Sequence, residues 1–223
     1  MPARGQKSEQ PVAKPGYHSP LRARQAAETR LTIVSAAIRL FGDRGWAATT
    51  LPMIAAEAGT AVDTIYSAFG SKSGLLMAAI DLAIAGDDEP TAMVDRPELS
   101  RFAEGTRLER LRTGVRFTMG VYERSLPILR TLQEAAASDE AARARLTQYD
   151  NDRRDVMIVG LGFILDGPAP DELVDAIWAI VSPEVLSMLT KGRGWSVAQA
   201  EAWFVEMCDA AIGNCRALQG SAS

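Results

Sequence analysis

Histidine is nearly absent from this sequence, and its scarcity removes several classes of catalytic site. The 223 residues contain one histidine, His18, which lies in a stretch rich in proline and glycine. A Ser-His-Asp triad, a Cys-His pair and a metal site built on several histidines are therefore disfavoured. We expect no catalytic residue, no metal and no cofactor. An all-helical enzyme that works through carboxylates stays as the less favoured alternative.

Cysteines and long apolar runs are scarce as well. The only two cysteines, Cys208 and Cys215, are seven residues apart in a helical segment, and two helical turns separate them by about 10 Å, too far for a disulfide within one chain. The longest apolar run, residues 156–165, has ten residues, whereas a membrane helix needs about 20. The N-terminus is basic and has no apolar segment of the kind found in export signals. These absences predict a reduced, cytoplasmic protein without membrane contact.

The net charge is positive only at the N-terminal end of an otherwise acidic chain. Residues 1–75 hold nine Lys or Arg against five Asp or Glu, whereas residues 76–223 hold fifteen against twenty-three. This asymmetry favours a polyanion contact at the N-terminal end, although a merely solvated basic tail gives the same composition.

Apolar residues recur at helical spacing along most of the chain, and no long stretch alternates with a period of two, so the predicted fold class is all-α. We expect Gly42 and Gly45 to end the first helix, Pro127 to open a new helix, and Pro183 to kink or split another. Prolines, glycines and charge clusters divide the chain into a disordered basic arm (1–20), a small helical unit (21–85), a connector (86–106) and a larger helical body (107–223).

Residues 49–76 carry the most informative pattern, two short helices joined by a tight turn. Thr50 can cap the first helix, where Pro52 is tolerated, and Gly59 suits the left-handed backbone of the turn. Ile54, Ala58 and Ile65 would fill the space between the helices. This spacing is typical of a helix-turn-helix, in which the second helix enters the major groove of DNA, but an ordinary helical corner in a protein core shares it.

The residues themselves resemble the N-terminal domain of the TetR/AcrR family of transcriptional regulators over about residues 25–80. The resemblance implies a three-helix DNA-binding domain with a helix-turn-helix, followed by a helical domain for ligand binding and dimerisation. Looser matches in the body are Ser182-Pro183-Glu184 and Gly194-Trp195-Ser196. The positions that match in the N-terminal domain are Ile33, Ala36, Ala37, Leu40, Phe41, Gly45, Thr50, Ile54, Ala55, Ala58, Gly59, Thr64, Ile65, Tyr66, Phe69, Lys72, Leu75 and Leu76.

What the resemblance implies about DNA contacts can be given residue by residue. Val62, Asp63 and Thr64 match positions that face base edges, and a threonine can exchange hydrogen bonds with a base while a valine packs on a thymine methyl. The matches for backbone contacts and for the basic N-terminal segment are Thr49, Thr50, Tyr66, Ser67, Lys72, Arg22 and Arg24. A plain helix cap is the competing interpretation of Thr50, and packing against the first helix that of Tyr66.

The second helix of the motif departs from the family pattern. Asp63 either accepts a hydrogen bond from a cytosine or points away from the groove. The segment 62–69 contains no Lys or Arg, so most of the DNA affinity must come from Lys72, the arm and backbone amides. Gly74 stands where a helix-favouring residue is common.

For the body, the resemblance implies a helical ligand pocket and a dimer formed by the last two helices. Expected pocket residues are Met119, Tyr122, Met157, Leu161 and Trp178, for each of which simple core packing is the competing interpretation. The charged residues of segment 150–155 are interpreted as a solvated helix face rather than a metal site. Expected dimer contacts are Val181, Val185, Leu189, Trp203, Phe204, Met207, Cys208, Ala211 and Cys215.

Taken together, the sequence predicts a homodimeric transcriptional regulator, a repressor in our interpretation, that binds a near-palindromic double-stranded DNA operator. A small apolar effector would release it by preferring one of two states. The main alternative is a dimeric helical small-molecule-binding protein that does not bind an operator.

Overall fold

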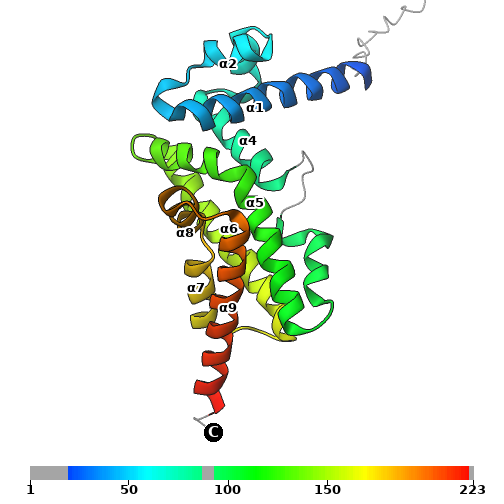
Figure 1. Ribbon diagram of the computed structural model, residues 1–223. Coiled ribbons are helices and arrows are strands. Elements are labelled where there is room, and N and C mark those ends of the chain that lie inside the picture. Colours follow the sequence, from blue (N-terminus) through cyan, green and yellow to red (C-terminus); the bar gives the residue numbers. More distant parts are fainter. Residues whose placement is uncertain (1–19, 87–92, 221–223) are drawn as a thin grey trace, which may run out of the picture.

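The computed structural model describes residues 20–86 and 93–220, and within these ranges every regular element is a helix (Figure 1). The all-α fold class is thereby confirmed. The predicted arm lies almost wholly outside the described residues. Helices α1 to α4 form one end of the molecule, and the C-terminus of the last helix lies at the opposite end. Their bounds are Pro20–Ala48 for α1, Leu51–Ala58 for α2, Val62–Phe69 for α3 and Lys72–Ala85 for α4.

The remaining elements build the larger body. Two 3₁₀ helices, η1 and η2, precede two long helices, α5 and α6, which lie against each other. A π-helical turn, η3, continues the short helix α8, and α9 closes the fold. The bounds are Met93–Asp95 for η1, Pro97–Ala103 for η2, Arg107–Ala136 for α5, Glu140–Leu165 for α6, Asp171–Ile180 for α7, Pro183–Ser187 for α8, Met188–Gly192 for η3 and Val197–Gly220 for α9.

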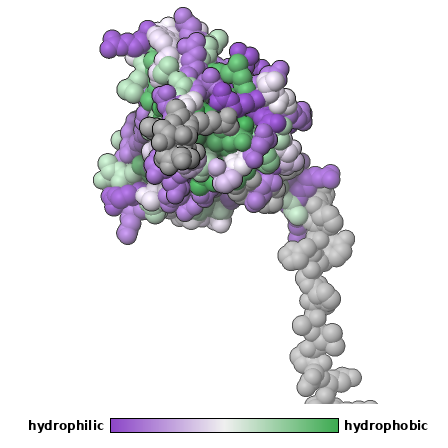
Figure 2. Space-filling model, turned by 90° about the horizontal axis from the view of Figure 1, so that it is seen from below, coloured by the Kyte–Doolittle hydropathy of each residue, from purple (hydrophilic) through white to green (hydrophobic). Residues whose placement is uncertain are grey.

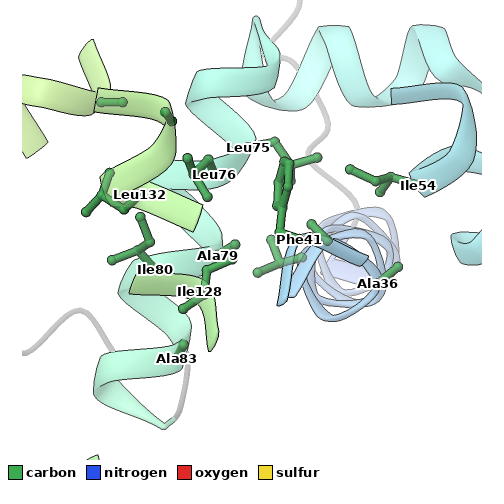
Figure 3. Close-up of a cluster of buried hydrophobic side chains, with 14 of the residues drawn as sticks. Ala36, Phe41, Ile54, Leu75, Leu76, Ala79, Ile80, Ala83, Ile128 and Leu132 are labelled. Atoms are coloured by element: carbon green, nitrogen blue, oxygen red, sulfur yellow. The ribbon is translucent and has the colours of Figure 1, made fainter. Parts of the chain in front are cut away.

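Helix α4 is the structural link between the two ends. One side of it contributes Leu75 to the small core around Phe41 of α1 and Ile54 of α2, while Ile80 lies toward Ile128 of α5 (Figure 3). All five side chains are fully buried. The core of the N-terminal helices therefore continues into α5 instead of stopping at the predicted connector. A displacement of α4 would accordingly change the packing against α1 and α2 as well as against α5.

A second core holds the body together. It joins α5, α6, α7 and α9 through buried aliphatic side chains and two large aromatics, Tyr122 of α5 and Phe204 of α9. The Tyr122 hydroxyl donates a hydrogen bond of 2.9 Å to the carbonyl oxygen of Val181, where α7 ends. This bond satisfies a phenol that would otherwise be costly to bury.

The helix boundaries follow the predictions in part. Gly45 interrupts α1 with φ 75° and ψ −179°, but Gly42 does not end the helix. The prediction that Pro127 opens a helix is wrong, because α5 runs through it. Pro127 is exposed, so solvent can serve the carbonyl one turn earlier that loses its amide donor. Pro183 does split its helix, between α7 and α8.

The apolar stretch Asp171–Gly192 is long enough, by length and composition alone, to cross a membrane. It is broken between α7 and α8, and its inner face, which includes Leu173, Ile177 and Leu186, packs into the second core. Asp175 on its outer face pairs with Arg154 of α6. Its apolar character is accordingly that of a helix buried in the core of a protein.

Candidate nucleic-acid interface and effector cavity

Helices α2 and α3 form a compact corner fixed by local hydrogen bonds. The Thr50 side chain accepts from the Met53 amide at 3.4 Å and caps α2, as predicted. Gly59 ends α2 in the left-handed conformation, with φ 65° and ψ 34°, and the Thr60 amide donates to the Ala55 carbonyl at 2.9 Å. Ile65 is fully buried beneath α3. The corner therefore has one sealed face and one outward face.

The outward face of α3 presents the residues expected to face DNA bases. Asp63 and Ser67 are exposed, and Tyr66 is 53% exposed, whereas Val62 and Thr64 are half-buried. The Ala61 cap position supplies no side-chain hydrogen bond to the start of α3. Five candidate contacts thus share one accessible helix, which is the arrangement that a groove-reading helix requires.

Thr49 and Thr50 differ in what they offer to a ligand. The Thr49 side chain is fully buried, and its hydroxyl lies 3.0 Å and 2.9 Å from the carbonyl oxygens of Leu40 and Gly45. Its one proton is therefore used inside the protein. Thr50 is exposed beside α3 and is the member of this pair that a phosphate can approach.

Lys72 at the start of α4 is engaged with the protein. Its ammonium group donates a hydrogen bond to the Trp46 carbonyl and lies 4.0 Å from the centre of the Trp46 ring. Burial lowers the pKa of the Lys72 ammonium from its usual value, because desolvation disfavours the charged form. The lysine therefore ties the start of α4 to the end of α1, and a phosphate contact would be additional to this role.

Two further arginines behave differently from the sequence expectation. Arg22 and Arg24 are exposed on the first turns of α1 and not on a separate arm. Arg30, which the sequence analysis does not single out, donates to the Ala68 carbonyl at 3.1 Å and lies 4.3 Å from the Phe69 ring centre. It fastens the end of α3 to α1. Its only signal in the sequence is its place about two helical turns after the other two arginines.

Gly74 owes its place to close packing between α3 and α4. A Cβ atom at this position would overlap the carbonyl oxygen of Phe69. The Ser71 hydroxyl, which caps α4, accepts from the Gly74 amide at 3.0 Å. The departure from the family pattern at Gly74 is therefore explained by the tight turn between the two helices.

A cavity of about 830 Å³ lies between α1 and α4 on one side and α5 and α6 on the other. Of the expected pocket residues, Tyr122 and Met157 line it. Met119 and Leu161 are sealed in the second core, and Trp178 packs under the guanidinium of Arg153, 4.1 Å from its Cζ atom. The cavity therefore lies nearer the N-terminal helices than those three residues suggest.

The cavity also contains polar residues that the sequence analysis assigns elsewhere. Arg153 is only 9% exposed and Tyr149 only 6%, so the prediction of a solvated face for segment 150–155 is wrong for Arg153. The signal was present in the spacing. Tyr149, Arg153 and Met157 recur every fourth residue and so share one stripe of α6.

The expected dimer residues separate into two groups. Val181, Phe204 and Cys208 are buried inside the protomer, and burial raises the pKa of the Cys208 thiol to about 12. The others are half-buried and lie on α8, η3 and α9, namely Val185, Leu189, Trp203, Met207, Ala211 and Cys215. Met188, which the sequence analysis omits, is 60% exposed on η3.

Comparison with known proteins agrees with this architecture. Residues 33–79 match the model of the bacterial regulatory proteins of the tetR family, while no curated protein sequence matches the chain. Among solved structures, a tetR-family transcriptional regulator from Streptomyces coelicolor superposes with a TM-score of 0.65 at 22% identity, over 86% of this chain and 83% of that one.

Two more structures share the fold. A protein from Mesorhizobium loti, described as a candidate TetR-family transcriptional regulator, gives a TM-score of 0.67 at 16% identity over 85% of this chain and 97% of that one. A candidate transcriptional regulator from Saccharomonospora viridis, solved in complex with choline, gives 0.59 at 21% identity over 82% and 96%. The likeness covers both the N-terminal helices and the body. Residues 33–79 thus form an N-terminal domain of the tetR family of bacterial regulatory proteins.

Proposed function

We propose that the protein is a homodimeric repressor that binds a near-palindromic operator and leaves it when a small molecule occupies the cavity. The observation that carries this proposal is the outward face of α3, where Asp63 and Tyr66 are exposed and Thr64 is half-buried while Ile65 is sealed beneath. Two such helices in a dimer would enter successive major-groove faces on one side of the duplex.

The position of the cavity supports an effector role. Its walls come from α1 and α4, which carry the candidate DNA-binding face, and from α5 and α6 of the body. Arg145 of α6 pairs with Asp81 of α4 at 2.8 Å across it, and Arg124 of α5 donates to the Ala83 carbonyl at 3.1 Å. A ligand that prefers one arrangement of these walls would shift α4, and α3 with it. The choline complex of the Saccharomonospora relative supports small-molecule binding by this fold.

Support for a dimer comes from the α8–α9 surface. Apolar and aromatic residues are half-buried there, among them Val185, Leu189 and Met207, and Trp195 and Trp203 meet edge to face with ring centres 6.4 Å apart. The view from below shows green apolar side chains among purple hydrophilic ones, so apolar groups reach the surface of the molecule (Figure 2). A surface of this kind suits an isologous contact between two copies.

Selection of bound fragments from random or genomic DNA, followed by a salt titration, tests the proposal. A specific operator should emerge, with two half-sites about 10 base pairs apart or a multiple of that spacing. The logarithm of the affinity should fall with the logarithm of salt by about 0.9 per phosphate neutralised. Recovery of ligand binding without any selected sequence would favour the alternative, a helical small-molecule-binding protein. Asp63 and the absence of Lys and Arg from α3 support that alternative.

A pair of variants separates base reading from backbone contact. We expect Thr64→Ala to cost about 1–3 kcal/mol at one base step and to relax the preference there. Lys72→Ala should weaken binding equally on all sequences and lower the salt slope by about 1. Because Lys72 also contacts Trp46, its variant is compared at matched folded fraction by circular dichroism. Equal losses across a panel of mutated operators for both variants would refute this division.

A further inference from the structure

Three buried donors on residues that line the cavity have no hydrogen-bond partner among the described residues, namely Arg145 Nη1, Tyr149 Oη and Arg153 Nε, and of these residues only Arg145 belongs to an ion pair. Tyr149 Oη and Arg153 Nε are buried and make no hydrogen bond within the described part of the chain, although both residues line the cavity. Each residue is more than nine-tenths buried. Buried polar groups almost always have a hydrogen-bond partner. Donors without a partner on residues that line one cavity therefore indicate an acceptor that arrives from outside.

The Arg153 side chain is held so that Nε stays available. Its Nη1 atom donates to the carbonyl oxygens of Trp178 and Val181 at 2.7 Å and 3.2 Å, and its Cζ atom lies 4.1 Å from the centre of the Trp178 ring. The Val181 carbonyl also accepts from the Tyr122 hydroxyl. These contacts fix the guanidinium at the end of α7 and consume no donor on the Nε side.

The arginines around the cavity differ in whether they form ion pairs with carboxylates. Arg145 pairs with Asp81 at 2.8 Å and with Asp152 at 3.9 Å, and Arg154 pairs outside the cavity with Asp171 and Asp175. Among the ion pairs of the described residues, Arg153 takes part in none. Its guanidinium does interact with the Asp150 carboxylate, because burial raises the pKa of Asp150 and the charge of Arg153 opposes that rise. A buried cation without an ion-pair partner is costly, and a bound anion lowers that cost.

We propose that the cavity binds a small carboxylic acid with an apolar body, whose carboxylate accepts hydrogen bonds from Tyr149 Oη and Arg153 Nε. This inference rests on the effector role proposed above and names the class of effector. Two unsatisfied donors, one of them on a guanidinium that forms no ion pair, match the two oxygens and single charge of a carboxylate better than a dianionic phosphate. The apolar body of the ligand lies against Met77, Val121 and Met157, which line the same cavity. The carboxylate gives Arg153 an ion-pair partner.

The test uses octanoate, decanoate and 4-phenylbutyrate as probes, each compared with its own primary amide. The amide keeps the shape of the acid and removes its charge. Binding to the full chain is measured by isothermal titration calorimetry and by the shift in melting temperature. We expect at least one acid to bind about tenfold or more tightly than its amide, the scale of a hydrogen bond to a charged group.

Three variants locate the effect. Tyr149→Phe should reduce the preference for the acid about fivefold or more, while the unliganded protein melts at the same or a higher temperature, because the deleted hydroxyl has no partner. Arg153→Met should abolish the preference. Arg154→Met removes the same charge from the same helix outside the cavity, and it should keep the preference within about twofold. If Arg153→Met does not fold, the Tyr149→Phe result and the acid–amide pairs decide.

Several outcomes would overturn the inference. These are equal binding of acids and amides, no binding by any acid, a Tyr149→Phe variant that keeps the full preference, or one that melts at a lower temperature than the wild type. Operator binding is measured with and without each probe. Acids and amides that both release DNA equally would contradict this inference and leave the proposed function standing. An acid bound with the expected preference that leaves DNA binding unchanged would contradict the effector role alone.

Discussion

The helix-turn-helix corner and the cavity wall differ in whether their polar side chains have hydrogen-bond partners. In the corner, Thr50 and Ser71 cap helices within three residues of their own position, and the Thr49 hydroxyl is used inside the protein. In the wall, the Tyr149 hydroxyl and Arg153 Nε are left open. These polar groups of the corner thus have their hydrogen-bond partners in the free protein, whereas those of the wall obtain theirs from a bound ligand. A fixed shape suits the reading of DNA, and an incomplete one suits a response to a ligand.

The largest expected difference between the two regions lies in packing. Phe41 is fully buried and stacks on Trp46 with ring centres 5.8 Å apart, so Phe41→Ala should lower the free energy of unfolding by about 3–5 kcal/mol. Met77→Ala in the cavity wall should cost only about 1 kcal/mol, because this half-buried side chain already borders open space.

Urea unfolding followed by circular dichroism measures both packing variants, with the wild type in the same series. Similar losses for the two variants would remove the distinction between a filled core and an incomplete wall. A larger loss for Met77→Ala would reverse it.

The sequence predicts the corner well because the corner is made by neighbours in the chain. Thr50, Gly59 and Ser71 each act on residues within five positions, and their residue types alone indicate caps and a turn. The exposure of Asp63 and the burial of Ile65 follow from helical spacing within eight residues. Gly74 also contacts a residue five positions away, but its residue type alone does not indicate why, because the Phe69 oxygen that excludes a side chain there belongs to the preceding helix.

The sequence predicts the body less well because its decisive contacts join distant segments. Charges beside Arg153 indicate a solvated face, yet the residue is buried by α7, whose Trp178 and Val181 carbonyls accept its hydrogen bonds. Two consecutive apolar residues of α9 differ as well, because Phe204 is buried in the protomer whereas Trp203 is half-buried. Apolar spacing shows which helix face is covered but not whether its own chain or a second copy covers it.

Two hydroxyl deletions give the next largest contrast. The buried Thr131 hydroxyl donates to the Phe41 carbonyl at 2.7 Å and joins α5 to α1. Thr131→Val should therefore cost about 1 kcal/mol, whereas Tyr149→Phe should cost nothing or stabilise the protein. Thermal and urea unfolding of both variants provide the measurement. A loss of stability on deletion of the Tyr149 hydroxyl would show that this group has a partner after all.

The smallest expected effect concerns the polar contact between α4 and α6, and it depends on pH. The Ser73 hydroxyl donates to the Asp139 carboxylate, which also caps α6 by accepting from the Ala142 amide at 2.9 Å. The hydrogen bond from Ser73 is the main cause that lowers the pKa of the Asp139 carboxyl, and the Ala142 amide adds to it. Ser73→Ala should cost less than about 1 kcal/mol at pH 7, because solvent screens this carboxylate.

The sign of the pH dependence follows from the direction of that shift. A carboxyl whose pKa is lower in the folded protein stabilises it above the unfolded value, here 3.8, and the contribution is lost as the pH falls through the folded pKa. The stability difference between wild type and Ser73→Ala should therefore be constant from neutral pH down to about 5 and should vanish in stronger acid. Ser138→Ala, on the exposed turn before Asp139, is the matched control and should track the wild type throughout. A stability difference between wild type and Ser73→Ala that persists at pH 2 would mean that the hydroxyl acts through packing. The contact between α4 and α6 would then not depend on the charge of Asp139.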